Sequence, residues 1–277
     1  MGDTVQIKVL GPLSAEVNGT SIVPTAGKPR QILSLMALYP GRVMPVPMLM
    51  EELWDTAPPA SALTTLQTYI LQLRRKLGTA MGPGSPAGVR DVLATRHGGY
   101  LLQIDDDCVD VHQYEKLLRE GSTAFETGDN EVSAARFRAA LALWNGAPLV
   151  DVKAGPVLDL EIRRLQESRL VAVERRIDAD LRLGRHGELT AELADLTVRH
   201  PYHEGLHAQA MLALYRSGRQ AAALETYRRL QRGLVEELGV ESSPRLQRMH
   251  QAMLAVDARL DVLSGPRNTS TFDLFAA

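Results

Sequence analysis

The chain has 277 residues, of which 45% are hydrophobic and 23% are charged, and its formal net charge at pH 7 is −2. This length allows one large or two ordinary domains, each able to bury a core. No apolar run is long enough to span a membrane, and the first residues lack the pattern of an export signal, so we expect a cytoplasmic protein. The single cysteine, Cys108, excludes an internal disulfide and a cysteine-rich zinc site.

The charge is divided unevenly along the chain. Residues 1–105 contain nine Lys and Arg against seven Asp and Glu, whereas residues 106–277 contain 22 against 26. The small basic excess lies in the first part, which is where a nucleic-acid contact is expected if the protein has one.

The first residues have the pattern of a small antiparallel sheet. Alternation of apolar and polar residues predicts a strand over Thr4–Leu10, and shorter strands follow at Leu13–Val17 and Ser21–Val23. Asn18-Gly19 between the last two is a strong signal for a two-residue hairpin turn, because both residues tolerate a positive φ.

Two helices follow this sheet. The first begins at Lys28-Pro29-Arg30 and ends before Pro40-Gly41, and the second covers Val46–Trp54. The residues from Asp55 to Pro59 then form a turn into a third, longer helix.

The third helix, Ser61–Leu77, is the most informative stretch of the chain. Its apolar residues at Leu66, Ile70, Leu73 and Leu77 form one buried stripe of an amphipathic helix. No acidic residue occurs between Ser61 and Leu77. The opposite face carries Thr64, Thr68, Leu71, Gln72 and Arg75. Hydroxyl, amide and guanidinium groups of this kind can contact base edges and phosphates in a major groove.

A hairpin is predicted after this helix. Gly78–Gly88 has the composition of a flexible loop, and its two prolines argue against a phosphate-binding loop. Val89–Arg96 and Tyr100–Ile104 are predicted strands, joined at His97-Gly98-Gly99 with Arg96 and His97 at the tip. Three helices followed by a hairpin with a basic tip are typical of a winged helix-turn-helix.

The rest of the chain is predicted to be helical. The segments with a 3.6-residue period are Val111–Thr127, Glu131–Trp144, Leu158–Leu183, Glu188–Arg199, His203–Arg216 and Gln220–Leu238. They form three helical pairs. Gly184-Arg185 and Gly218-Arg219 are 34 residues apart, which is the period of tetratricopeptide repeats.

Several sequence motifs resemble those of a known family. TLQTYILQLRRKL (residues 65–77) and TRHGGYLL (residues 95–102) resemble the OmpR/PhoB-type winged helix. VLGPL (residues 9–13), KPRQ (residues 28–31) and the helical half resemble the Streptomyces antibiotic regulatory protein (SARP) family more specifically. The likeness covers about residues 5–255, and the chain is similar to the short members that carry no ATPase or sensor module.

The resemblance implies a fold class and a division of the chain. We expect an α+β winged helix-turn-helix of OmpR type at residues 1–106, followed by an all-α, tetratricopeptide-like bacterial transcriptional activation domain at residues 107–264. Residues 265–277 are predicted to form a flexible tail, in which Phe272, Leu274 and Phe275 are able to dock on a groove.

The resemblance also implies a function. Members of the family bind direct repeats near the promoter −35 region as head-to-tail dimers, contact RNA polymerase including its sigma factor, and activate antibiotic biosynthetic gene clusters. We therefore expect a transcriptional activator that binds double-stranded DNA, has no membrane partner, needs no cofactor and is not an enzyme.

Candidate DNA-binding residues follow from the face of the third helix, the basic cluster at its end, the start of the first helix and the hairpin tip. They are Lys28, Arg30, Thr64, Thr65, Thr68, Gln72, Arg74, Arg75, Lys76, Arg96 and His97. Lys28 and Arg30 begin a helix, where cations are unfavourable, and this suggests a phosphate partner. Arg74 to Lys76 also suit the negative end of a helix dipole, so a purely structural role for that cluster stays open.

One motif points to a different class of protein. His203-Glu204-Gly205-Leu206-His207 has the HExxH spacing of a zinc hydrolase, and Glu225 lies at a distance along the chain where a third ligand occurs. Pro201-Tyr202 places the motif in a first helical turn and Gly205 weakens the helix, so we disfavour this interpretation. Two further alternatives stay open: a DNA-binding regulator whose helical domain senses a small molecule, and a repressor.

Overall fold

The computed structural model describes residues 3–83 and 88–260, and the chain divides into two compact units. Unit 1 comprises Met1–Lys116 and Ala140–Arg169, and unit 2 comprises Leu117–Ala139 and Leu170–Ala277. The predicted tail at residues 265–277 lies outside the described residues. No helix within the described ranges has the length and apolar character of a membrane span.

Unit 1 begins with a three-stranded antiparallel sheet. Its strands β1 (Val5–Lys8), β2 (Ser14–Val17) and β3 (Thr20–Ser21) pair in that order. Asn18 and Gly19, with φ of 52° and 76°, form the predicted turn between β2 and β3.

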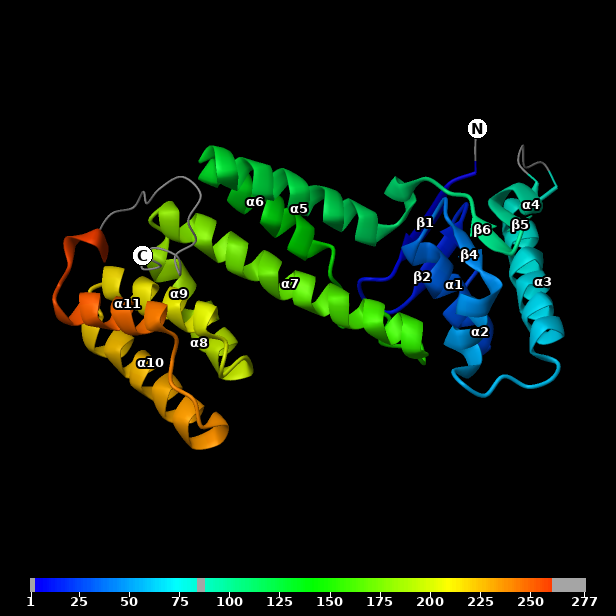
Figure 1. Ribbon diagram of the computed structural model, residues 1–277. Helices are drawn as coiled ribbons and strands as arrows, with labels where there is room; N and C mark the ends of the chain where they lie inside the picture. Colours follow the sequence, from blue (N-terminus) through cyan, green and yellow to red (C-terminus); the bar gives the residue numbers. More distant parts are fainter. Residues whose placement is uncertain (1–2, 84–87, 261–277) are drawn as a thin grey trace. The chain divides into compact units, whose positions relative to one another are not determined.

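Three helices form the body of the winged helix, and Figure 1 shows them in blue to cyan. They are α1 (Gly27–Leu38), α2 (Val46–Trp54) and α3 (Ala62–Met81). Nine of the twelve residues of α1 are buried, which makes this helix the centre of unit 1. In α3, Leu66, Ile70, Leu73 and Leu77 are buried as the apolar period predicts.

A second sheet, with the order β4-β6-β5, forms the wing. Its central strand β6 (Gly99–Leu102) and edge strand β5 (Leu93–Arg96) form the predicted hairpin. The sequence did not predict β4 (Val43–Pro45), because it is only three residues long and ends in proline. A Cβ atom on Gly99 would lie 2.2 Å from the carbonyl oxygen of Met44, so β4 and β6 need a glycine there.

Two predictions around the end of α3 are wrong. Residues 78–81 continue the helix rather than starting a loop, because Met81 adds one more buried position four residues after Leu77. Gly82, with φ of 74°, ends the helix. Val89–Val92 forms a short helix, α4, rather than a strand, because the carboxylate of Asp91 accepts a hydrogen bond from the N–H of Gly88 at 2.8 Å.

Buried carboxylates join the winged helix to the residues that follow it in unit 1. Glu52, 2% exposed, accepts hydrogen bonds from the backbone N–H groups of Gly155 at 2.6 Å, Val157 at 3.1 Å and Leu158 at 2.9 Å, at the start of α7 (Pro156–Arg182). Gly155 lies so close that a Cβ atom there would be 1.9 Å from the carbonyl oxygen of Glu52. Glu52 therefore caps a helix about one hundred residues away in sequence.

Two aspartates also accept hydrogen bonds from backbone N–H groups that are far away in sequence. Asp110 accepts from the N–H groups of Val9 at 2.9 Å and Leu10 at 3.1 Å, and Asp151 accepts from Leu13 at 2.7 Å. Burial raises the pKa of Glu52 and Asp110, whereas the N–H donors oppose that rise. The two sequence halves thus share one compact unit in residues 1–116 and 140–169.

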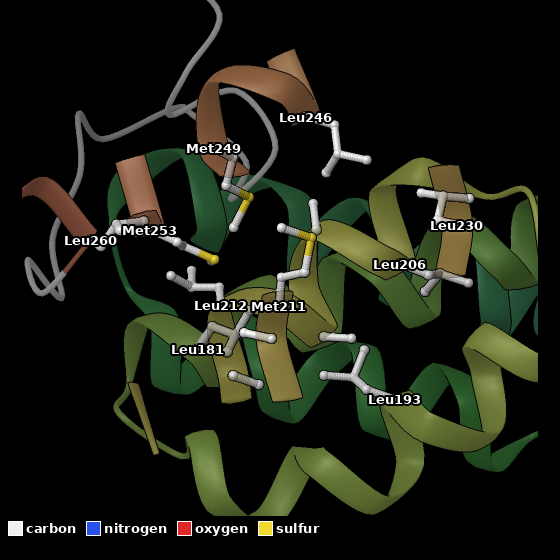
Figure 2. Close-up of a cluster of buried hydrophobic side chains, with 14 of the residues drawn as sticks. Leu181, Leu193, Leu206, Met211, Leu212, Leu230, Leu246, Met249, Met253 and Leu260 are labelled. Carbon is white, nitrogen blue, oxygen red and sulfur yellow. The ribbon is translucent and has the colours of Figure 1, made fainter. Parts of the chain in front are cut away.

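The helical part also contains α5 (Asp110–Thr127) and α6 (Asn130–Ala142), and the division between the units falls inside α5, α6 and α7. Unit 2 continues with α8 (His186–Arg199), α9 (Glu204–Arg216), α10 (Gln220–Gly233) and α11 (Pro244–Leu254). Their apolar faces meet in one core that includes Leu193, Leu206 and Leu230 (Figure 2).

The 34-residue period relates α8 to α10 and does not relate α9 to α11. Helix α8 and helix α10 are offset by 34 residues at both ends, and Gly184 and Gly218 have φ of 79° and 73° before them. A π-helix at Leu234–Leu238 delays the start of α11. We did not predict α11, although Ser243 followed by Pro244 is a helix start signal, and the Ser243 hydroxyl does accept from the N–H of Leu246.

A charged network joins three helical segments of unit 2. The carboxylate of Asp180, 2% exposed, pairs with Arg138, with Arg176 at 3.5 Å and with Arg185 at 2.8 Å. A buried carboxylate with several cationic donors is tolerated because its charge is compensated.

The predicted fold class, a winged helix followed by tetratricopeptide-like helices, is confirmed.

We predict that Glu52→Ala lowers the unfolding free energy by about 2 to 4 kcal/mol, because buried N–H groups of α7 lose their acceptor. Glu51→Ala is the matched control, since Glu51 is the exposed neighbour on the same helix. Calorimetry of the full chain measures both. Equal melting temperatures for the two variants would show that the Glu52 contact does not stabilise unit 1.

Candidate nucleic-acid interface

The exposed face of α3 carries most of the predicted base-contacting residues. Thr64, Thr68, Gln72 and Arg75 are all exposed, whereas Thr65 and Lys76 are half-buried at the edges of the face. The Thr68 hydroxyl donates to the carbonyl oxygen of Thr64 at 3.0 Å, which leaves its oxygen free to accept. The structure therefore brings four of the predicted residues together on one surface.

The electrostatic environment of this face suits an anionic ligand. No Asp or Glu occurs between Asp55 and Asp91 in the sequence, a range that contains the whole of α3. Arg75 is exposed near its C-terminal end, and Arg90 is exposed on α4. A duplex with one phosphate charge per about 1.7 Å of helix axis meets no opposing carboxylate from this stretch.

Two exposed residues on this face were not among the predicted contacts. Gln67 is exposed beside Thr64 and Thr68, and Leu71 is 47% exposed between Thr68 and Arg75. The helical period alone places them there, so the sequence contained the signal for both.

Arg74 has a use within the protein that the sequence did not predict. Its Nε and Nη2 donate to the carbonyl oxygen of Leu93 at 3.0 and 2.8 Å, and Nη2 also donates to the Thr95 hydroxyl at 2.9 Å. Burial, with the neighbouring Arg90, lowers the pKa of Arg74. Arg74 therefore fixes strand β5 of the wing to α3, and a phosphate contact by this residue stays a prediction.

The tip of the wing carries the other predicted residues. Arg96 and His97 are exposed, and Gly98, with φ of 76°, forms the turn. The carbonyl oxygen of Gly98 accepts a hydrogen bond from the N–H of Val46 at 2.9 Å, which ties the tip to the start of α2. The wing is thus bound to α2 at its turn and to α3 at strand β5.

Lys28 and Arg30 have partners within the protein. The Lys28 ammonium lies 4.5 Å from the ring centre of Trp54, and burial together with Lys153 lowers its pKa. Arg30 donates to the carboxylate and the carbonyl oxygen of Asp151, both at 3.0 Å. These contacts account for two cations at the start of α1 without a phosphate, and DNA binding by Lys28 and Arg30 stays a prediction.

The HExxH residues have other roles in unit 2. The carboxylate of Glu204 accepts from the Ser243 N–H at 3.0 Å and from its hydroxyl, and the Nδ1 atom of His203 accepts from the Leu206 N–H at 3.4 Å. His207 is 3% exposed, and burial lowers its pKa to about 4. Within residues 3–83 and 88–260, no three His, Cys, Asp or Glu side chains are placed to hold a metal.

A fold of this kind defines a class of protein, the winged-helix transcription regulators with an attached helical domain. Residues 20–102 match the family described as "Transcriptional regulatory protein, C terminal", and residues 109–254 match "Bacterial transcriptional activator domain". The chain is similar to the regulatory protein DnrI of Streptomyces peucetius, with 54% identity over 93% of this chain and 94% of that protein.

Longer relatives share the same region. The regulatory protein AfsR of Streptomyces griseus is 36% identical over 93% of this chain, which spans only 25% of that protein. The solved structure of Mycobacterium tuberculosis EmbR in complex with a low-affinity phosphopeptide has a TM-score of 0.87 and 29% identity, over 99% of this chain and 69% of that one. The chain belongs to the Streptomyces antibiotic regulatory protein family, and it is a transcriptional regulator.

We predict that Arg74→Lys weakens DNA binding by about 3- to 10-fold without changing its salt dependence, because a lysine cannot make the forked bonds that hold β5. Arg75→Ala should instead reduce the slope of log affinity against log salt by about one. Titrations at several salt concentrations compare the two. A reduced slope for an Arg74→Ala variant would mean that Arg74 contacts phosphate.

We also predict a pH effect from Glu174, which lies beside His203. Burial, and next the charge of Asp178, raises the pKa of Glu174 from 4.5 to about 7. The unfolded chain therefore loses this proton near pH 4.5 and the folded protein only near pH 7, so the unfolding free energy falls as pH rises between these two values. Glu174→Gln should therefore raise the unfolding free energy at pH 8 by about 2 to 3 kcal/mol and leave it unchanged at pH 4. An equal effect at both pH values, measured by chemical denaturation, would exclude this cause.

Proposed function

We propose that the chain is a sequence-specific DNA-binding activator of an antibiotic or secondary-metabolite gene cluster. The observation that carries the proposal is the exposed, acid-free face of α3, held beside the wing by Arg74. Thr64, Thr68 and Gln72 are the candidates for base contacts, with Arg75 on base or phosphate. Thr65, Lys76 and Arg96, together with His97, are proposed to contact the backbone or the neighbouring minor groove.

The finer parts of the proposal come from family membership. We propose that two copies bind direct repeats near the promoter −35 region, recruit RNA polymerase through its sigma factor, and act in the cytoplasm without catalysis of their own. Relatives such as the regulatory protein DnrI and the transcriptional regulator RedD of Streptomyces coelicolor support regulation of transcription. The domain division at residues 106 and 264 is part of this proposal.

Selection from a random duplex library with the full chain tests the function and supplies a binding site. On that site, Thr68→Ala and Arg75→Ala should each weaken binding by about 1 to 3 kcal/mol, or roughly 5- to 150-fold, because each removes a base or phosphate contact.

Two substitutions of the same type outside α3 serve as controls. Thr123 on α5 and Arg199 on α8 are exposed in unit 2, and their alanine variants should bind as wild type. If all four variants bound equally in a titration, the reading surface would lie elsewhere. If no sequence were enriched, sequence-specific binding itself would be contradicted.

A second candidate function rests on a groove in unit 2. The groove, about 430 Å³ in volume, is lined by α8, α9 and α10, and its lining includes Ala194, Ala210 and Ala222 beside Arg219 and Glu225. Its size falls in the range of small-molecule sites. It supports the alternative that the helical domain senses a small molecule, which would appear as a rise in melting temperature with intermediates of the regulated pathway.

A further inference from the structure

Leu71 is an apolar residue in a polar place. It is 47% exposed on α3, one position past the buried Ile70, and therefore outside the stripe that packs on the body of unit 1. The other residues around it on this face are Gln67, Thr68 and Arg75. A leucine outside the buried stripe leaves its exposed part available for a partner of the face.

The proposed partner of this face offers one matching group. In the major groove, base edges present hydrogen-bond donors and acceptors, and their single apolar substituent is the C5-methyl group of thymine. Threonine, glutamine and arginine on the same face match the polar groups, whereas a leucine matches the methyl group. Because no acid occurs between Asp55 and Asp91 and Arg75 lies on the face, its charge complements the phosphates of duplex DNA, which we take as the occupant.

We infer that Leu71 determines specificity by contacting the C5-methyl group of a thymine in the bound site, a role that rests on the proposed function. Arg75 lies one helical turn beyond Leu71 and Gln67 one turn before it, so the thymine lies within the stretch of bases read by polar contacts on either side. Recognition of the methyl group at that base pair then depends on Leu71.

Replacing thymine by uracil removes the methyl group and leaves every hydrogen-bonding group of the base unchanged. The full chain is titrated with duplexes of the selected site in which each thymine in turn is replaced by uracil. Burial of one methyl group contributes about 0.8 kcal/mol. We therefore expect wild type to bind one or two of the singly substituted duplexes about fourfold more weakly, and the others with unchanged affinity. In Leu71→Ala this uracil effect disappears.

Two further variants serve as controls for the Leu71→Ala result. Leu160→Ala is the matched control, because Leu160 is 66% exposed on α7 and should keep the full uracil effect. Leu71→Met retains an apolar end and should keep part of it. Thermal melting of both Leu71 variants should stay close to wild type, because Leu71 lies outside the buried stripe of α3.

The outcomes separate this inference from the function on which it rests. Uracil effects that are the same in wild type and Leu71→Ala would overturn the thymine contact while specific binding remained. An equal loss of affinity on thymine and uracil duplexes in Leu71→Ala, or a loss of cooperativity between two copies, would assign Leu71 to a protein contact instead. Failure of wild type to select any sequence would contradict the proposed function itself.

Discussion

The structure of unit 1 depends on buried carboxylates that accept hydrogen bonds from backbone N–H groups far away in sequence. Glu52 binds the start of α7, and Asp110 binds Val9 and Leu10. Without these carboxylates, the backbone N–H groups at the start of α7 and at Val9 and Leu10 would lose their hydrogen-bond acceptors. The winged helix consequently shares a compact unit with residues 140–169, although the two family matches meet between residues 102 and 109. A fragment ending near residue 109 would lack the partners of Glu52, so binding experiments need the full chain.

The candidate interface depends on contacts within this unit. Arg74 ties β5 to α3 through Leu93 and Thr95, and Val46 ties the hairpin turn to α2. A reading helix and a wing held in one geometry lose little conformational freedom on binding, which favours affinity and register on a duplex. The same arginine cannot be counted as a free phosphate ligand while it makes these bonds. One residue of a basic cluster therefore supports the surface on which its neighbour Arg75 is presented.

Much of this fold could be predicted from the apolar periodicity of the helices and from local turn signals. The stripe of Leu66 to Leu77 and the Asn18-Gly19 turn are local patterns, and the structure has both. Some of the misses have longer-range causes: β4 exists through its pairing with β6, and the roles of Arg74 and Glu52 depend on which backbone groups the fold brings near them. Helix α11, by contrast, has a local start signal in Ser243-Pro244. The HExxH pattern shows the converse, since its glutamate binds Ser243 and one of its histidines is buried. Whether the exposed face of α3 binds DNA is not something periodicity decides.

Photo-crosslinking tests the account most directly. The selected duplex is synthesised with 5-iodouracil in place of individual thymines, so that the reactive atom lies in the major groove. After irradiation with the full chain, mass spectrometry identifies the attached residues. Because α3 is expected to lie in the groove, the account predicts attachment between Ala62 and Arg75. Attachment confined to α8–α11, or to elements of unit 1 other than α3, would contradict it.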